Sequence, residues 1–420
     1  MIKVKAGALQ FTTFIVVVIA LLLSGFILFI HTYKKIDVQQ QLTKETIDNA
    51  KFGIYHSLSN EMPLNDSTKV SIIENTFKTL TVYRDFWGIY EKIVSVSRIK
   101  NMDFTQIALA GSSQPENDRT ALYIEDHNRP LVLVGKTKIK GTSYVPQQGV
   151  RTGNISGHSY YGAELIYGKQ KTSKTLPKLQ SEWLGGLEQI SNKYTHVDAK
   201  QYLDLEQNLS HTNSFKAPIQ MIYSKFDIDL TNVSLTGHIV VQSKTRIIVD
   251  ASSNLKDVLL IAPSIQIKDQ VKGVFQGIAS KEIRVGERCQ LNYPSALVLN
   301  DYRSGVDVDK SVLNSPTIII GRGSVLKGVI TCLGEIKNYQ SQLFIEKDAK
   351  VYGEVYCNMN LELLGSVFGS VYASSFVAKQ SGSVYQNHIY NGTIIVDELP
   401  QEYVGLSFKD SNKGIAKWLY

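Results

Sequence analysis

A stretch of 28 residues without a charged side chain lies near the N-terminus, between Lys5 and Lys34. Within it, Ala8 to Ile30 is a 23-residue apolar run, whose few polar or small interruptions are Gln10, Thr12, Thr13, Ser24 and Gly25. A helix of this length is about 35 Å long, enough to cross a hydrocarbon core of about 30 Å. A cleaved signal peptide fits less well, because the apolar region of a signal peptide is usually about 7–15 residues long. In addition, Ile30–Tyr33 offers no small-residue cleavage site. The sequence therefore predicts a retained membrane-spanning helix, with the lipid bilayer as a partner.

Basic residues flank both ends of this helix, so the positive-inside rule gives little direction. Lys3 and Lys5 precede the run, and Lys34, Lys35 and Lys44 follow it. Because nearly the whole chain follows the helix, we expect a single pass that places the bulk of the protein outside the cytoplasm. In a bacterium this corresponds to the inner membrane, with the bulk of the chain in the periplasm.

Beyond the apolar run the pattern becomes polar but stays helical. Apolar residues repeat at the spacing of one helix face, at Ile47, Ala50, Ile54 and Leu58. We therefore predict that residues 1–60 form a membrane-spanning helix and a helical stalk. Pro63 follows, and a proline disfavours helix at the residue before it. A second short helix is expected at residues 67–83.

Period-two alternation then replaces the helical pattern, which is typical of strands. Short β-type runs separated by Gly, Asn and Asp occupy residues 92–98, 107–110, 121–124 and 130–134. Residues 61–180 are therefore predicted to form a small β-rich domain, of α+β type with its expected helix. A helical patch from Ser181 to Tyr194 and a polar linker follow, so residues 181–216 are expected to connect two domains.

Residues 217–396 have a single texture of short β-branched runs, each followed by a few polar or glycine residues. Near the end the runs become a repeat, because Gly328–Cys332, Gly353–Cys357 and Gly369–Ala373 align in one register. A period of about 16 residues suits one coil of a solenoid whose strands stack in parallel on the coil before. We predict a parallel β-helix here, followed by a C-terminal tail at residues 397–420.

Two segments of these repeats, Ile319–Ile330 and Ala349–Val355, resemble the coils of bactofilins, the bacterial polymer-forming cytoskeletal β-helix proteins. The resemblance extends from Thr317 to Ile395. It implies a right-handed parallel β-helix without a catalytic centre, in a family whose members assemble end to end as scaffolds. The chain departs from that family in its transmembrane helix, its separate β domain and its longer, less regular β-helix. The expected fold is thus mainly β with an N-terminal α part.

The N-terminus resembles the layout of type IV pilins and pseudopilins, which are cut after a glycine that precedes an apolar helix. Here Lys5-Ala6-Gly7 precedes such a helix, which continues as an amphipathic stalk into a β domain. The resemblance implies leader cleavage after Gly7. Those proteins typically carry Glu at the fifth residue after the cut, where this chain has Thr12. Some tip-located minor members of the family also lack the Glu.

Carboxylates at the spacing of one strand face occur in two places. Asp227 and Asp229, and likewise Asp307 and Asp309, lie two residues apart. Since some parallel β-helices are polysaccharide lyases and hydrolases, a carbohydrate-active enzyme is one alternative. The two pairs are far apart in the chain and have no His or Arg motif alongside, so a solvated strand edge explains them better. We therefore expect no enzyme.

The sequence shows no pattern for a metal or cofactor, and neither is expected. It has no CxxC pair, no His cluster at metal-ligand spacing, no Gly-rich phosphate loop and no nucleophile elbow. The first cysteine is Cys289, so no cysteine follows the apolar run and a bacterial lipoprotein is excluded. Three cysteines are few and odd in number for a chain of this length, so disulfides are not expected to be the main source of stability. Cys332 and Cys357 hold equivalent positions in the repeats, with Ala373 next. We predict that they are buried and stacked about 4.8 Å apart.

Positive charge is concentrated in one window. The chain carries a net charge of +7, and residues 136–178 account for all of it, with eight basic side chains against the single acid Glu164. Tyrosines and a histidine are interleaved, the mixture expected of a surface that binds an anionic polymer by charge and stacking. A solvated face of the β domain is the alternative. The candidate binding residues for a polysaccharide or nucleic acid are Lys136, Lys138, Lys140, Arg151, Lys169, Lys171, Lys174 and Lys178.

These features favour a membrane-anchored structural protein of the bacterial cell envelope, whose β-helix serves as a scaffold or interaction domain among other subunits of an assembly. Two alternatives stay open. One is a pilin-like minor subunit of a type IV pilus or a type II secretion-like machine. The other is a carbohydrate-active β-helix enzyme.

Overall fold

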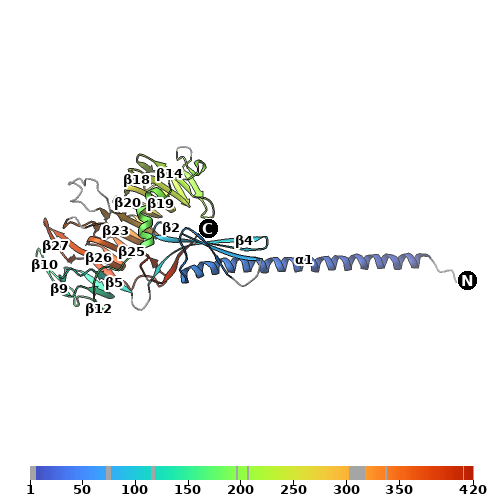
Figure 1. The fold of residues 1–420 in the computed structure, drawn as a ribbon, viewed down its shortest axis with the longest axis horizontal. Coiled ribbons are helices and arrows are strands. Elements are labelled where there is room, and N and C mark those ends of the chain that lie inside the picture. The colour runs from blue at the N-terminus through green and yellow to red at the C-terminus, as the bar shows by residue number, and fades with distance from the viewer. Residues whose placement is uncertain are drawn as a thin grey trace.

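One long helix projects from a head that is built mostly of strands (Figure 1). In this computed structural model the head has two parts, an antiparallel sheet and a parallel β-helix, and the sheet lies between the long helix and the β-helix. The structure describes residues 6–71, 77–114, 119–194, 197–205, 208–301, 317–335, 338–409 and 411–419. The expected fold class, mainly β with an N-terminal helix and a parallel β-helix, is confirmed.

The N-terminal helix α1 is a single element from Ala6 to Ser59. It joins the predicted membrane-spanning run and the predicted stalk without a break, because no proline precedes Pro63. Its first half extends away from the head, and its second half lies against the antiparallel sheet (Figure 1). The stalk is therefore a support for the head as well as a spacer.

The antiparallel sheet combines the segment after α1 with the C-terminal end of the chain. Its strands follow the order β1-β2-β3-β4, and β4 then pairs with both β30 and β31. The strands are β1 Ser67–Val70, β2 Lys78–Trp87, β3 Tyr90–Ile99, β4 Met102–Ser113, β30 Val404–Gly405 and β31 Lys413–Leu419. The segment predicted as a tail, residues 397–420, thus contributes two strands, β30 and β31, to the sheet.

The prediction of a helix at residues 67–83 is wrong, because the described part of this segment forms β1 and the start of β2. Burial alternates along β2, where Leu80 and Val82 are buried and Thr81 and Tyr83 are partly exposed. Such alternation is the pattern of a strand with one face on a core. Pairing with β3 along its whole length outweighs the weak helical pattern.

Both faces of the antiparallel sheet are covered. Ala108 and Ala110 of β4 pack in one core with Ile54 of α1, whereas Ile107 and Leu109 pack in a second core with residues of the β-helix. The alternation of side chains along a strand makes this division possible. The molecule therefore has three layers: α1, the antiparallel sheet and the β-helix.

The β-helix has three sides, and on each side a strand pairs in parallel with the equivalent strand of the next coil. Long strands turn the corners between sides, namely β19 Asn254–Ile267, β20 Lys272–Val285, β25 Lys350–Leu363 and β26 Ser366–Gln380. The other strands are β13 Ser210–Asn213, β14 Gln220–Ser224, β15 Ile228–Leu230, β16 Ser234–Gly237, β17 Ile239–Ser243, β18 Arg246–Val249, β21 Gln290–Asn300, β22 Ile318–Ile320, β23 Val325–Leu333, β24 Leu343–Ile345, β27 Ser383–Gln386, β28 His388–Tyr390 and β29 Thr393–Ile395.

Residues 120–172, which we assigned to a small β-rich domain at 61–180, instead form the last coils of the β-helix. The first of these coils stacks on the preceding one, as β5 pairs in parallel with β26, β6 with β28 and β7 with β29. β8, β9 and β12 then add further rungs. The bounds are β5 Thr120–Ile124, β6 Leu131–Val134, β7 Lys138–Lys140, β8 Thr142–Val145, β9 Val150–Thr152 and β12 Gln170–Thr172, with a hairpin of β10 Asn154–Ile155 and β11 His158–Ser159. In Figure 1, β5, β9 and β12 accordingly lie at one end of the solenoid, and β14 and β18 lie at the other.

The helical patch predicted at Ser181–Tyr194 is present as α2, Ser181–Glu188, and α3, Ile190–Lys193, and the turn η2, Ala199–Gln201, follows. Trp183 of α2 is buried against the outer face of the β-helix, in the same core as Trp87 of the antiparallel sheet. This connector therefore covers one side of the solenoid while it carries the chain from one end to the other.

Glycines line one corner of the β-helix, where consecutive coils approach closely. Gly328, Gly353 and Gly369 stand in register, as their alignment in the sequence predicted. A Cβ built on Gly353 would lie 1.9 Å from the carbonyl oxygen of Gly328, and the φ of +146° is one that side chains rarely adopt. Glycine is thus required at this corner in each of these coils.

We expect Gly353→Ala to lower the free energy of unfolding by about 2 to 4 kcal/mol, because the added methyl group must displace the backbone of the preceding coil. Gly185→Ala is the matched control, since Gly185 lies in α2 and a Cβ there would meet nothing within 4 Å. Urea denaturation followed by circular dichroism measures both. Equal losses in the two variants would contradict the close approach of the coils.

Candidate assembly helix and junction groove

The first half of α1 presents apolar side chains on every side. Leu9, Phe14, Leu21 and Leu28 are each between 65% and 73% exposed. Among the described residues this helix is the one that is long and apolar enough to cross a membrane. Because the head leaves this half uncovered, the apolar surface requires a bilayer or the helices of other subunits around it.

The two neighbouring threonine hydroxyls near the start of the apolar half are satisfied by the helix itself. The hydroxyl of Thr13 donates to the carbonyl oxygen of Leu9 at 2.7 Å, and that of Thr12 donates to the same carbonyl at 2.9 Å. Such bonds remove the cost of placing a hydroxyl in hydrocarbon. Gly7, the candidate cleavage site, lies exposed near the start of α1, and nothing stands within 4 Å of where its side chain would be.

The second half of α1 docks on the antiparallel sheet through one face. Thr46, Ala50, Ile54 and Ser57 are buried there, whereas Ile47, which we expected on this face, is 38% exposed. The buried positions follow the spacing of a helix stripe, but Thr46 replaces Ile47 in it. At Gly53 the helix comes so close that a Cβ would lie 2.2 Å from the Ser95 hydroxyl.

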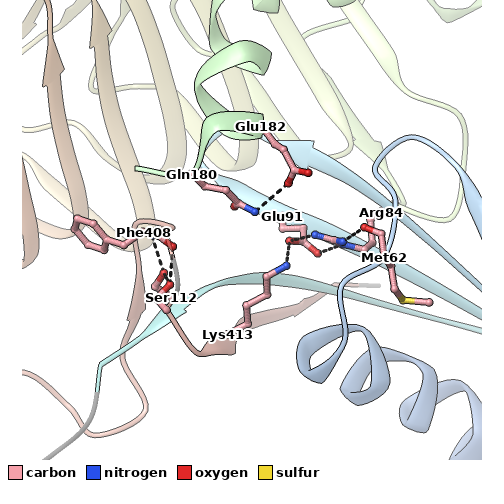
Figure 2. A network of polar contacts seen from close by, with 9 residues as sticks. Met62, Arg84, Glu91, Ser112, Gln180, Glu182, Phe408 and Lys413 are labelled. Carbon is pink, nitrogen blue, oxygen red and sulfur yellow. Dashed lines mark hydrogen bonds and ion pairs between the residues drawn. The ribbon is translucent and has the colours of Figure 1, made fainter. Parts of the chain in front are cut away.

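A groove of about 1280 Å³ opens where α1 ends against the head. Its walls come from the end of α1 with the loop that follows, the end of β4 at Ser112 and Ser113, the start of α2, and residues within 401–409 and 411–415. Figure 2 shows its polar contacts, where the amide of Phe408 donates to the hydroxyl of Ser112 at 3.0 Å and Gln180 donates to Glu182 at 3.0 Å. The groove thus joins four parts of the chain that are far apart in sequence.

An ion triad of two buried residues, Arg84 and Glu91, and the partly exposed Lys413 lies at this groove (Figure 2). The guanidinium of Arg84 binds both carboxylate oxygens of Glu91, at 2.5 and 2.8 Å, and donates to the carbonyl of Met62. Lys413 of β31 binds Glu91 at 2.8 Å. Burial acts to raise the pKa of Glu91, but the hydrogen bonds and charges of Arg84 and Lys413 outweigh it and lower that pKa.

We expect Glu91→Gln to lower the free energy of unfolding by about 3 to 5 kcal/mol, because it leaves the buried Arg84 charge without a counter-ion. The matched control is Asp227→Asn, which breaks the ion pair with Arg246 in which both side chains are more than two-fifths exposed. That control is expected to cost far less, since water screens the pair. Urea denaturation measures both variants, and a Glu91→Gln variant as stable as the control would contradict the role of the triad.

A second buried carboxyl group holds the C-terminal segment on the β-helix. Glu354 of β25 is fully buried, and its two oxygens accept hydrogen bonds from the backbone amide of Leu406 at 2.6 Å and from the side chain of Gln114 at 2.5 Å. Nearby, the hydroxyl of Tyr293 donates to the carbonyl of Val404 at 2.8 Å. Burial raises the pKa of Glu354 to about 7, although both donors act to lower it.

We expect Glu354 to make the head less stable as the pH rises from about 4.5 to 7. In this range the unfolded chain releases the proton, since the ordinary pKa is 4.5, while the folded chain keeps it up to a pKa of about 7. Below 4.5 both states hold the proton, and above 7 both release it, so the loss levels off at about 3 kcal/mol. Denaturation of wild type and Glu354→Gln from pH 4 to 8 measures this, and the difference between the two curves should change only within that window.

The candidate basic residues do not form one surface. Lys138 and Lys140 point outward from β7 on one side of the last coils, Arg151 lies on β9 on another side, and Lys171 lies on β12 on the third. Lys140 binds Asp397 at 2.8 Å. The remaining candidates are exposed residues outside these strands, namely Lys136, Lys169, Lys174 and Lys178. The four candidates that lie on strands are thus divided among three sides of the last coils.

Of the two candidate carboxylate pairs, the pair of Asp227 and Asp229 lies within the described residues. Asp227 binds Arg246 at 2.5 Å and accepts the hydroxyl of Thr245, which hold its pKa below the ordinary value. Asp229 accepts a hydrogen bond from Thr231. Asp307 and Asp309 lie outside the described residues.

The cysteines lie in the interior of the β-helix. Cys332 and Cys357 are buried and in register, with Ala373 next in the ladder, as predicted. Burial raises the pKa of the Cys332 thiol, which keeps it protonated. Over the residues that the structure describes, no group of three or more His, Cys, Asp or Glu is placed to hold a metal ion.

The triad and Glu354 were missed in the sequence. Arg84 and Glu91 flank a two-residue turn at Gly88 and Ile89, and a charged residue at a buried step of an alternating strand is a detectable signal. Lys413 and Glu354 give no such signal, because their partners lie far away in the chain.

Comparison with known proteins gives little further guidance. No family model matches the chain, and no curated protein matches it. Among solved structures, the chain is similar to the competence-associated pilin ComZ from Thermus thermophilus, at 9% identity and a TM-score of 0.26, over 90% of this chain and 95% of that chain. A TM-score this low does not establish a common fold.

Proposed function

We propose that the protein is a pilin-like structural subunit of a bacterial envelope assembly, held in the inner membrane by α1 before it joins the assembly. The observation that carries the proposal is the division of α1. One half is apolar and uncovered on all sides, while the other half of the same unbroken helix docks on an antiparallel sheet. The β-helix then forms a head that the helix displays.

The physics of the exposed half supports both a membrane stage and an assembled stage. In a bilayer each large apolar side chain is stabilised by about 1.5 to 3 kcal/mol relative to water, and the backbone is satisfied within the helix. A bundle of such helices from neighbouring subunits provides an equivalent environment. Transfer from bilayer to bundle therefore exposes no apolar surface to water.

The proposal places the head in the periplasm and the N-terminal tail in the cytoplasm, with cleavage after Gly7 during maturation. At the position of the Glu that pilins typically carry, Thr12 has its hydroxyl bonded within its own helix. It therefore offers no charge at that position. The role is structural, and the β-helix serves as a scaffold or interaction domain.

We expect α1 helices of different copies to be in contact along their apolar halves in the assembled state. Leu21→Cys, at a side chain that is 68% exposed, should form an intermolecular disulfide upon mild oxidation in the membrane. Ala50→Cys is the matched control in the same helix, because Ala50 is buried against the sheet. The native cysteines are buried and should not contribute. Non-reducing gel electrophoresis measures the dimer.

Cleavage after Gly7 is tested by measuring the intact mass of the chain. Coexpression with a prepilin peptidase should yield a chain that starts at Ala8, and Gly7→Leu should remain uncut. A chain that keeps its first seven residues, together with no dimer from Leu21→Cys, would overturn the pilin-like function.

A further inference from the structure

A slot of about 480 Å³ lies between the α2–α3 connector and the outer face of the β-helix. It is separate from the junction groove and shares no residue with it. Its volume falls within the range of about 300 to 1,000 Å³ that small-molecule sites occupy. The slot crosses four consecutive coils, from β17 to β21.

The floor of the slot is an apolar ladder. Ile261 and Ile278 are outward-facing partners in register on neighbouring coils, and Pro263 lies beside them. Leu187 and Ile190 of the connector form the opposite wall. Among the residues that the structure describes, those that line the slot include no aromatic side chain. This surface suits a ligand with flat C–H faces and has no platform for a nucleobase.

An amide side chain stands at each end of this floor. Gln242 is in register with Ile261 and is only 1% exposed; its Nε2 donates to the carbonyl of Ser191 at 2.7 Å, while its Oε1 has no donor. The Oδ1 of Asn300 is likewise shielded from solvent and has no donor. Buried carbonyl oxygens are almost always paired, so the slot has two acceptors that call for donors. The last torsion of an amide side chain is soft, which lets the Asn300 oxygen turn toward a ligand, whereas the bond to Ser191 fixes the amide of Gln242.

The charges at the slot cancel. Glu188 and Lys244 both line it and carry opposite signs. An anion would meet no net attraction, and a fatty acyl chain would leave the amides unpaired. With coils about 4.8 Å apart, Gln242 and Asn300 stand about 14 Å apart along the solenoid. A ligand that satisfies both ends is therefore extended, uncharged and rich in hydroxyl donors.

We propose that this slot binds the end of a neutral glycan, about two sugar rings long. The C–H faces of the rings pack on Ile261 and Ile278, and ring hydroxyls donate to the side-chain oxygens of Gln242 and Asn300. The site recognises glycan without cleaving it. This recognition is a property of the head and does not depend on whether α1 assembles as a pilin.

The test is isothermal titration of the full-length protein with cellobiose, maltose and N,N′-diacetylchitobiose in separate runs. A polyoxyethylene detergent is used, because maltoside detergents carry a competing sugar. We expect saturable binding of at least one disaccharide with one site per chain. Asn300→Leu and Gln242→Leu should each weaken it about tenfold, the effect of one hydrogen bond of about 1.4 kcal/mol.

Two further variants make the result decisive. Gln266→Leu is the matched control, since Gln266 is exposed on β19 and does not line the slot, and it should bind like wild type. Ser191→Trp places an indole over the slot while the backbone carbonyl that holds Gln242 is kept, so it should abolish binding even if Gln242→Leu fails to fold. No saturable binding of any of the three disaccharides would overturn the proposal, and so would affinity that is unchanged in Asn300→Leu and Ser191→Trp.

Discussion

The burial of both faces of the antiparallel sheet is the interaction on which the rest of the structure depends. Side chains at alternate positions of β4 pack on α1 and on the β-helix, so the sheet fixes the position of α1 relative to the β-helix. Without it, α1 would be a long helix with nothing to hold its docked half. The ion triad and Glu354 lie at the margins of this sheet, where strands from both ends of the chain meet.

The path of the chain explains why these contacts are so distant in sequence. After β4 the chain enters the β-helix at its far end, crosses through α2 and α3 to the opposite end, and winds back coil by coil until it meets the first strands again. The contact of Ser374 with Glu125, at 2.7 Å, joins residues 249 apart. After its last coil the chain returns to the antiparallel sheet as β30 and β31.

The sequence was informative wherever a signal is local. The uncharged run, the end of α1 before Pro63, the glycine register at Gly353 and the cysteine ladder were all predictable, because each rests on spacing along the chain. The assignment of residues 120–172 failed for a physical reason: a short strand with buried alternation fits any open edge, and its own residues do not identify the neighbour. The basic window shows the same limit, since residues of one sequence window lie on three sides of the last coils.

The last described strand, β31, completes a sheet whose other long strands are among the first parts of the head to be synthesised. Until β26 to β29 are made, the first strands of the solenoid lack the coil on which they stack. Until β31 is made, most of the edge of β4 stays open beside α1. Folding of the head is therefore completed by β31, a strand that is distant in sequence from its partner β4. A chain that lacks β31 would leave most of the edge of β4 unpaired, and an unpaired edge is a template for pairing with another chain.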